Sequence, residues 1–187
     1  MALTALDPKT ALLVIDLQKG IVGMLSAEQS AGGVANAARL TKAFRRQGLP
    51  VVLVNVAGGS PGRVEQRRNL GDLPPDWTEI IPELDRQPGD HLVTKRSWGA
   101  FTDTDLDAHL RGRGVTQVVL AGIATSVGVE STARFAHELG YNVTLAHDAM
   151  ADRSPEAHQY SLTQIFPRIG ETGTSAEIVA MLDRGEA

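Results

Sequence analysis

Three positions in this chain are placed to do chemistry together: Asp16, Lys95 and the turn that ends at Gly128. Asp16 directly follows the apolar run at residues 11–15, and Lys95 ends a predicted strand at 91–95. Burial beside an apolar wall destabilises an ionised carboxylate unless a partner offsets it, and Lys95 is the natural partner. Such a pair can transfer a proton, or it can simply be an ion pair that fastens two strands. The spacing leaves both interpretations open.

The turn at residues 122–128, with the sequence GIATSVG, leads into a predicted helix. Backbone N–H groups at the start of a helix can bind an anion or an oxyanion. The alternative is that its glycines serve only a tight turn and close packing. Gly128 falls in the first helical turn, where glycine costs roughly 0.5–1 kcal/mol relative to alanine. Its presence there indicates that space is needed at this position.

Several other chemistries are not supported by the residue types. The chain has no cysteine, so it has no thiol nucleophile, no disulfide and no thiolate metal site. Ser126 and Ser131 are weaker nucleophile candidates, because neither lies in a Gly-x-Ser-x-Gly motif. No Gly-x-Gly-x-x-Gly follows the first strand, and no metal-ligand spacing occurs among the histidines at 91, 109, 137, 147 and 158. We therefore predict neither a metal nor a cofactor.

The elements that must position these residues alternate between strand and helix. Strands are predicted at 11–15, 50–56, 91–95, 117–121 and 142–146, with a short one near Ile169. Helices are predicted at 33–47, 104–113, 126–139, 154–166 and 175–183, the second capped by Asp103 or Thr102. This alternation predicts a single α/β domain over residues 1–187, with helices on both faces of a parallel sheet. The carboxyl ends of parallel strands share one edge, so Asp16, Lys95 and the turn are expected to meet there.

A long polar stretch from 57 to 76 is rich in glycine, proline and arginine and is predicted to be a loop. A loop of this length inside a domain is usually functional or part of an interface. Its segment at 58–62, GGSPG, has the composition of a phosphate cradle but is more typical of a flexible loop.

The overall composition is that of a soluble protein. The chain has 187 residues and a formal net charge of -4, which gives no basic field for nucleic acid or acidic lipid. The first 20 residues have no basic segment followed by an apolar run long enough for a signal peptide or a membrane span. We expect a cytoplasmic protein that acts on a small molecule.

Three blocks of the sequence resemble the isochorismatase-like hydrolases, also called the cysteine hydrolase superfamily. They are ALLVIDLQKGIV at 11–22, the segment from TKRSWGAF to ESTAR at 94–134, and GYNVTLAHDA at 140–149. The resemblance covers nearly the whole chain. It implies a three-layer sandwich with a six-stranded parallel sheet in the order 3-2-1-4-5-6. It also implies a homo-oligomer, as a dimer or larger assembly, and a cis peptide between Ile123 and Ala124.

The resemblance also implies which residues form the site. The usual trio of this family is an aspartate, a lysine and a cysteine; Asp16 and Lys95 match the first two, and Gly128 stands where the cysteine belongs. This pattern points to a subgroup with glycine in place of the nucleophile. The family's isochorismate-cleaving branch also carries glycine there, and its reaction needs no protein nucleophile. Residues expected to contact substrate are Gln18, Trp98, Phe101, Ala124, Thr125 and Val127.

The segment before the glycine departs from that branch, which carries tyrosine and histidine where this chain has Ala124 to Ser126. Three functions therefore remain. The preferred one is a cofactor-free hydrolase that acts on a small anionic substrate by acid–base attack of water, with isochorismate as a candidate. The second is an amide hydrolase that uses water instead of a thiol. The third is a small-molecule-binding or oligomeric protein that has lost its nucleophile.

Overall fold

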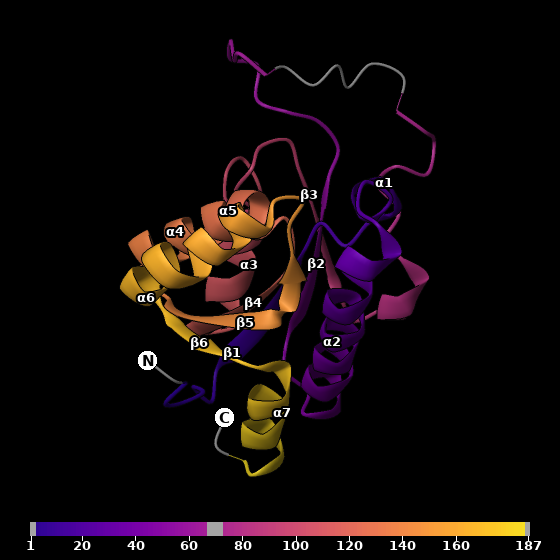
Figure 1. The fold of residues 1–187 in the computed structure, drawn as a ribbon. Helices are drawn as coiled ribbons and strands as arrows, with labels where there is room; N and C mark the ends of the chain where they lie inside the picture. The colour runs from indigo at the N-terminus through magenta and orange to yellow at the C-terminus, as the bar shows by residue number, and fades with distance from the viewer. Residues whose placement is uncertain (1–2, 67–72, 186–187) are drawn as a thin grey trace.

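The computed structural model describes residues 3–66 and 73–185. Its centre is a sheet with the strand order β3-β2-β1-β4-β5-β6, and every neighbouring pair runs parallel. The strands are β1 (Thr10–Ile15), β2 (Val51–Val56), β3 (His91–Lys95), β4 (Gln117–Ile123), β5 (Asn142–Ala151) and β6 (Glu171–Gly173). The predicted order and the parallel arrangement are both confirmed (Figure 1).

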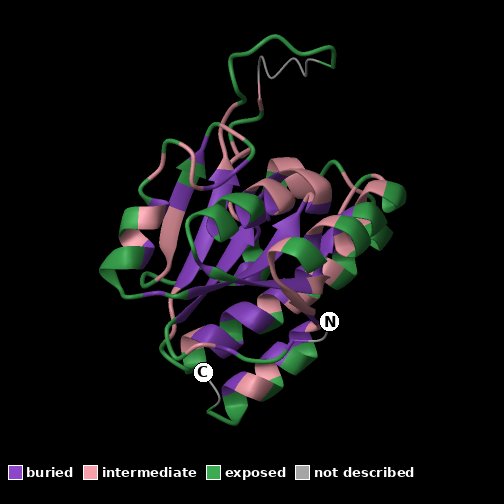
Figure 2. Cartoon of the chain, turned by 90° about the vertical axis from the view of Figure 1, so that its left-hand side faces the viewer, coloured by how far each residue is buried: buried purple, intermediate pink, exposed green. Residues whose placement is uncertain are grey.

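Helices cover both faces of this sheet and make it the middle of three layers (Figure 1). One face carries α2 (Ala27–Arg46), α7 (Ser175–Asp183) and the short 3-10 helix η1 (Pro82–Leu84). The other carries α3 (Leu106–Gly112), α4 (Glu130–Glu138), α5 (Pro155–Tyr160) and α6 (Phe166–Ile169). Because β1 lies between these layers, all six of its residues are buried, and successive side chains enter two separate apolar cores. Figure 2 shows the buried strands enclosed by helices with exposed outer faces.

Two helix starts differ from the sequence prediction. The first long helix begins at Ala27 and not at residue 33, because Ser26 and Gln29 form a capping box ahead of the apolar pattern. It is preceded by α1 (Lys19–Val22). The helix predicted from residue 104 begins at Leu106, with Asp105 as its N-cap. Asp103, one of the two caps predicted, has a φ of 54° and lies before the helix.

Two predicted helices are divided. The segment predicted as 126–139 begins with a π turn, η2 (Thr125–Val129), before α4. The segment predicted as 154–166 contains α5, a π turn η3 (Ser161–Ile165) and then α6. β5 extends five residues beyond the predicted end at 146, and its register shifts between Leu120 and Gly122 of β4. The short last strand lies at 171–173, just after the predicted place near Ile169.

The predicted loop projects from the edge of the sheet at which β2 and β3 end (Figure 1). Its described parts, residues 57–66 and 73–76, contain no helix or strand, and residues 67–72 of the prediction lie outside the described residues. Across the described chain, no helix is long and apolar enough to cross a membrane.

Candidate active site

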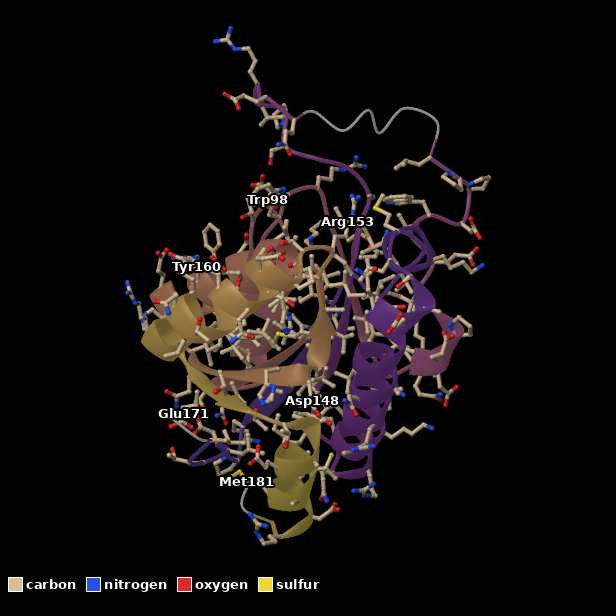
Figure 3. The ribbon with its side chains drawn as sticks, in the orientation of Figure 1. Trp98, Asp148, Arg153, Tyr160, Glu171 and Met181 are labelled. Carbon is tan, nitrogen blue, oxygen red and sulfur yellow. The ribbon has the colours of Figure 1, made fainter. Side chains whose placement is uncertain are left out.

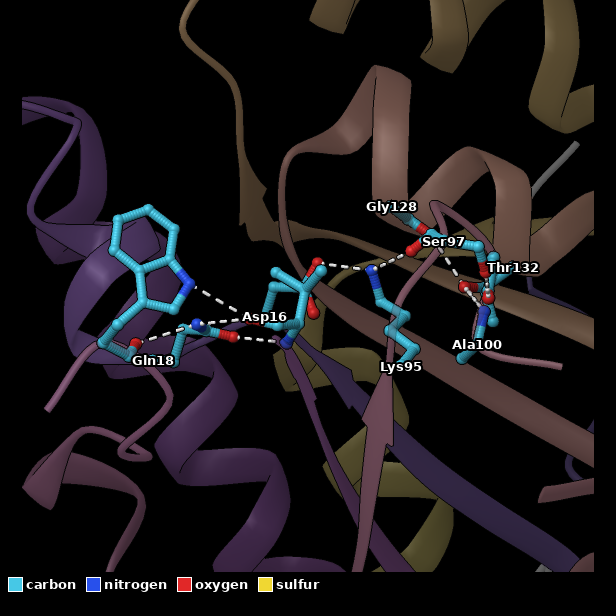
Figure 4. Close-up of polar contacts among 10 residues, drawn as sticks. Asp16, Gln18, Lys95, Ser97, Ala100, Gly128 and Thr132 are labelled. Atoms are coloured by element: carbon cyan, nitrogen blue, oxygen red, sulfur yellow. Dashed lines mark hydrogen bonds and ion pairs between the residues drawn. The ribbon is translucent and has the colours of Figure 1, made fainter. Parts of the chain in front are cut away.

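Asp16 and Lys95 form a buried ion pair at the carboxyl ends of β1 and β3. Lys95 Nζ lies 2.8 Å from Asp16 Oδ2, and the two residues are only 2% and 5% exposed. Asp16 has a φ of 52°, in the left-handed region that aspartate tolerates better than most residues. Lys95 Nζ also donates a 3.1 Å hydrogen bond to the Ser97 carbonyl (Figure 4). The predicted partnership of Asp16 and Lys95 is therefore present.

Two effects act in opposite directions on the Asp16 carboxyl. Burial disfavours its charged form and raises its pKa from 3.8 to about 6, although the charge and hydrogen bond of Lys95 oppose that rise. Desolvation thus outweighs the neighbouring ammonium. The second carboxyl oxygen, Oδ1, is buried and has no hydrogen-bond partner in the structure. A buried carboxyl with one unpartnered oxygen and a raised pKa is suited to donate or accept a proton at that atom.

Gly128 leaves open the space against this carboxyl. A Cβ built at Gly128 would lie 3.0 Å from Asp16 Oδ2 and 3.1 Å from Ile15 Cγ2. The structure thus brings all three predicted catalytic positions together. Even a methyl group at position 128 would press against the Asp16 carboxyl.

The Gly128 carbonyl also links α4 to the segment after β3. It accepts a 2.7 Å hydrogen bond from the Thr132 hydroxyl, and Thr132 Oγ1 accepts a 3.1 Å bond from the Ala100 amide (Figure 4). This chain of contacts holds the start of α4 against the segment that carries Ser97, which in turn binds Lys95.

The turn at residues 124–128 is tied to the end of β5. The Ile123–Ala124 peptide is cis, as expected. Asp152 Oδ2 accepts hydrogen bonds from the backbone N–H and the hydroxyl of Ser126, at 2.8 and 2.7 Å. The Val127 and Val129 amides both donate to the Ala124 carbonyl. The amides of Ser126, Val127 and Val129 therefore have partners within the protein, which reduces the number of donors that this turn offers to an anion.

A second tether comes from α5. The Thr125 hydroxyl lies 2.7 Å from His158 Nδ1 and donates a 3.2 Å hydrogen bond to the Ala151 carbonyl. Burial lowers the pKa of His158, which favours its neutral form. Asp152 and His158 were not anticipated as site residues, because β5 was expected to end at 146 and the turn after it carried no recognised motif.

The residues predicted to contact substrate have different environments. Gln18 is fully buried, and its amide binds the Val56 N–H and the carbonyls of Val56 and Trp77. It joins the end of β1 to the end of β2 (Figure 4), and its amide is engaged by the backbone. The Thr125 side chain is likewise buried and hydrogen bonded. These two residues position the site in this structure.

The other four predicted contacts lie nearer the surface. Ala124 and Val127 are half-buried. Phe101 is half-buried and stacks on Tyr141 with 5.9 Å between ring centroids. Trp98 is 65% exposed and lies at the end of the sheet from which Lys95 emerges (Figure 3). Among the described residues, no group of three or more histidine, aspartate or glutamate side chains is arranged to hold a metal.

The fold is a three-layer α/β sandwich, and a buried acid–amine pair lies at the carboxyl edge of its sheet. This pair adjoins the start of the helix that follows β4. Comparison with known proteins identifies the family: residues 10–177 match the Isochorismatase domain. The chain belongs to this family of isochorismatase-like hydrolases.

Individual relatives support this assignment along nearly the full chain. The chain is 47% identical over 178 residues to the uncharacterized isochorismatase family protein YwoC of Bacillus subtilis (strain 168). The match covers 91% of this chain and 93% of that protein. The structure of an isochorismatase family protein from Burkholderia thailandensis superposes with a TM-score of 0.90 at 45% identity, covering 96% of this chain and 98% of that one. The ureidoacrylate amidohydrolase RutB of Variovorax paradoxus (strain S110) is 34% identical over 179 residues, covering 80% and 70%.

Proposed function

We propose that this chain is a cofactor-free hydrolase that cleaves a small anionic substrate by acid–base attack of water, with Asp16 as the acid. The observation that carries the proposal is the Asp16 carboxyl itself, which is buried, has a pKa raised to about 6 and has an unpartnered Oδ1. General acid catalysis of this kind typically contributes roughly 10²–10⁴-fold to a rate.

The candidate reaction is hydrolysis of a vinyl ether such as isochorismate. Asp16 in its acid form protonates the methylene carbon of the enol ether, which leaves an oxocarbenium ion and the Asp16 carboxylate. Water adds to that ion and returns a proton to the site, and the resulting hemiketal collapses to pyruvate and the ring alcohol. No covalent bond to the protein forms, so the reaction is compatible with Gly128, where no nucleophile is present.

Lys95 has a positioning part in this scheme. Its hydrogen bond to Asp16 Oδ2 leaves Oδ1 as the oxygen that can carry the transferred proton. Its charge lowers the Asp16 pKa, so at neutral pH the acid form is the minor one before substrate binds. A bound substrate carboxylate would raise that pKa and favour the acid form.

The test is a coupled assay of pyruvate release from isochorismate with the parent protein, Asp16→Asn and Asp16→Ala. The proposal predicts release by the parent and a loss of at least about 100-fold in Asp16→Asn. Release that is equal in all three proteins would remove Asp16 as the acid. The same panel extended to small amides tests amide hydrolysis, the reaction named for the relative RutB.

A non-catalytic binding function is the remaining alternative, and it makes a different prediction. All hydrolysis assays would stay at background, while a small-molecule ligand would still raise the melting temperature by binding the native state.

A further inference from the structure

Two arginines directly follow residues that build the candidate site or hold its turn. Arg96 directly follows Lys95, and its Cγ and Nη1 lie 3.7 and 3.5 Å from the position that a Cβ on Gly58 would occupy, so its side chain runs along the segment leaving β2. Arg153 directly follows Asp152, whose carboxylate holds the 124–128 turn. Figure 3 places Arg153 over the same end of the sheet as Trp98.

Neither guanidinium is satisfied by the protein. Both residues are exposed, and within the described part of the chain neither forms a hydrogen bond or an ion pair. Other arginines show the contrast, since Arg45 lies 2.6 Å from Asp90 and Arg134 lies 2.9 Å from Glu130. An arginine without a carboxylate partner keeps its planar set of donors available for a ligand.

The carboxylates that belong to the candidate site and to the turn beside it are already engaged. Asp16 is paired with Lys95, and Asp152 accepts hydrogen bonds from Ser126 and from the Ser154 amide. They are held by their own partners, which leaves the positive charge of Arg96 and Arg153 uncompensated beside the site in a chain of net charge -4.

We propose that Arg96 and Arg153 recognise a carboxylate on the substrate and so determine its class. This inference rests on the proposed function and deepens it, because it names the groups that select an anion.

The two arginines are expected to act in substrate binding and not in the chemical step. Lys95 supplies the charge that acts on the Asp16 carboxyl, and neither arginine contributes to it. Arg96 and Arg153 therefore bind a substrate group remote from the reacting atoms.

Binding of two shape-matched probes tests the inference without requiring turnover. Cyclohexanecarboxylate carries the charge, and cyclohexanecarboxamide is its neutral analogue. The dissociation constant of each is measured at pH 7.5 by NMR titration with the full chain, Arg96→Gln, Arg153→Gln and the double variant. We expect the parent to prefer the carboxylate, each single variant to lose about three- to tenfold for it, and the carboxamide affinity to be unchanged.

Arg39→Gln is the matched control, because Arg39 is also exposed and unpaired among the described residues but lies on α2. It should leave both affinities unchanged. Equal binding of the two probes by the parent, or site variants that bind the carboxylate as Arg39→Gln does, would overturn the inference. Asp16→Asn separates the two proposals: it abolishes hydrolysis if the function is right, and it retains the carboxylate preference if the arginines select the anion.

Discussion

At the scale of single residues, the Asp16 carboxyl determines what this site can do. Burial raises its pKa to about 6 and Lys95 works against that rise, so this group changes charge within one to two pH units of neutrality. An ordinary ion pair would fasten two strands with an aspartate that stays ionised. The raised pKa and the unpartnered Oδ1 favour the chemical interpretation over that structural one.

The raised pKa has a consequence for stability. Because the folded state holds the Asp16 proton more tightly than the unfolded state, its contribution is largest at low pH and is lost as the pH rises through about 6. The free energy of unfolding of the parent, relative to Asp16→Asn, should fall by up to about 3 kcal/mol between pH 4 and pH 7. Urea unfolding of both proteins across this range measures it. A difference that rises with pH would show that the pKa is lowered instead.

Gly128 supports a second prediction. Alanine in a helix is normally more stable than glycine by roughly 0.5–1 kcal/mol, but a Cβ here meets Asp16 Oδ2 and Ile15 at 3.0 and 3.1 Å. Gly128→Ala should therefore lack that gain, and its methyl group should desolvate the carboxyl and raise the Asp16 pKa above 6. The pKa is measured by carboxyl ¹³C NMR and the stability by thermal unfolding.

Gly32→Ala is the control for this substitution, because Gly32 lies in α2 with nothing within 4 Å of the added Cβ. It should show the ordinary helical gain and leave the Asp16 pKa unchanged. A gain of equal size in Gly128→Ala, with no shift of the Asp16 pKa, would contradict the close contact.

At the scale of elements, the site depends on how β4 passes into α4. The 124–128 turn begins at a cis peptide and continues as the π turn η2, and Asp152 and His158 attach it to β5 and α5. These attachments hold Gly128 against a carboxyl that belongs to a different strand, β1.

Removal of the Asp152 tether is the corresponding prediction. Asp152→Ala leaves the Ser126 N–H without its charged acceptor and should lower the free energy of unfolding by about 1–3 kcal/mol. It should also let water reach Asp16 and bring its pKa back toward 3.8. Glu156→Ala, which removes only an exposed acceptor of the Ser154 hydroxyl, is the control and should do neither. An Asp16 pKa that stays near 6 in Asp152→Ala would show that the turn does not depend on this tether.

Much of this arrangement could be predicted from sequence, and the exceptions have a common cause. The apolar run at residues 11–15 locates the buried strand β1, and Asp16 follows directly after it. β3 has a mixed sequence, and Lys95 is its last residue. The extension of β5 to Ala151 follows a register shift against β4, which depends on a neighbouring strand and leaves no local pattern. For the same reason the tethers of Asp152 and His158 were not predicted. The position of Gln18 just after β1 predicts contact with substrate. Its amide is instead held by the backbone of a segment nearly 40 residues away.

At the scale of the whole molecule, several large apolar side chains remain exposed. Trp98 and Tyr160 are 65% and 60% exposed. Phe135 of α4 and Leu139, the C-cap residue of that helix, are 44% and 39% exposed. Figure 3 shows Trp98 and Tyr160 at the side of the molecule covered by α4 and α5. Exposed apolar groups of this size on one side are typical of an interface between proteins.

The family resemblance implies a homo-oligomer, and we propose that its interface would lie on this side. Sedimentation velocity at micromolar concentration should give a dimer or a larger assembly for the parent. Phe135→Lys should shift the distribution toward monomer, because a charge on α4 would be desolvated in the interface. The exposed α2 variant Arg39→Gln serves as the control. A parent protein that sediments as a monomer at all concentrations would contradict this expectation.

The pH dependence of hydrolysis tests the central claim most directly. The value of kcat/KM for isochorismate, or for another vinyl ether or amide that the protein hydrolyses, reports the ionisation of the free enzyme. If Asp16 acts as the acid, kcat/KM falls about tenfold for each pH unit above about 6, and Asp16→Asn loses both the activity and this dependence. A kcat/KM that rises through pH 6 would assign Asp16 the part of a base and contradict the proposed mechanism.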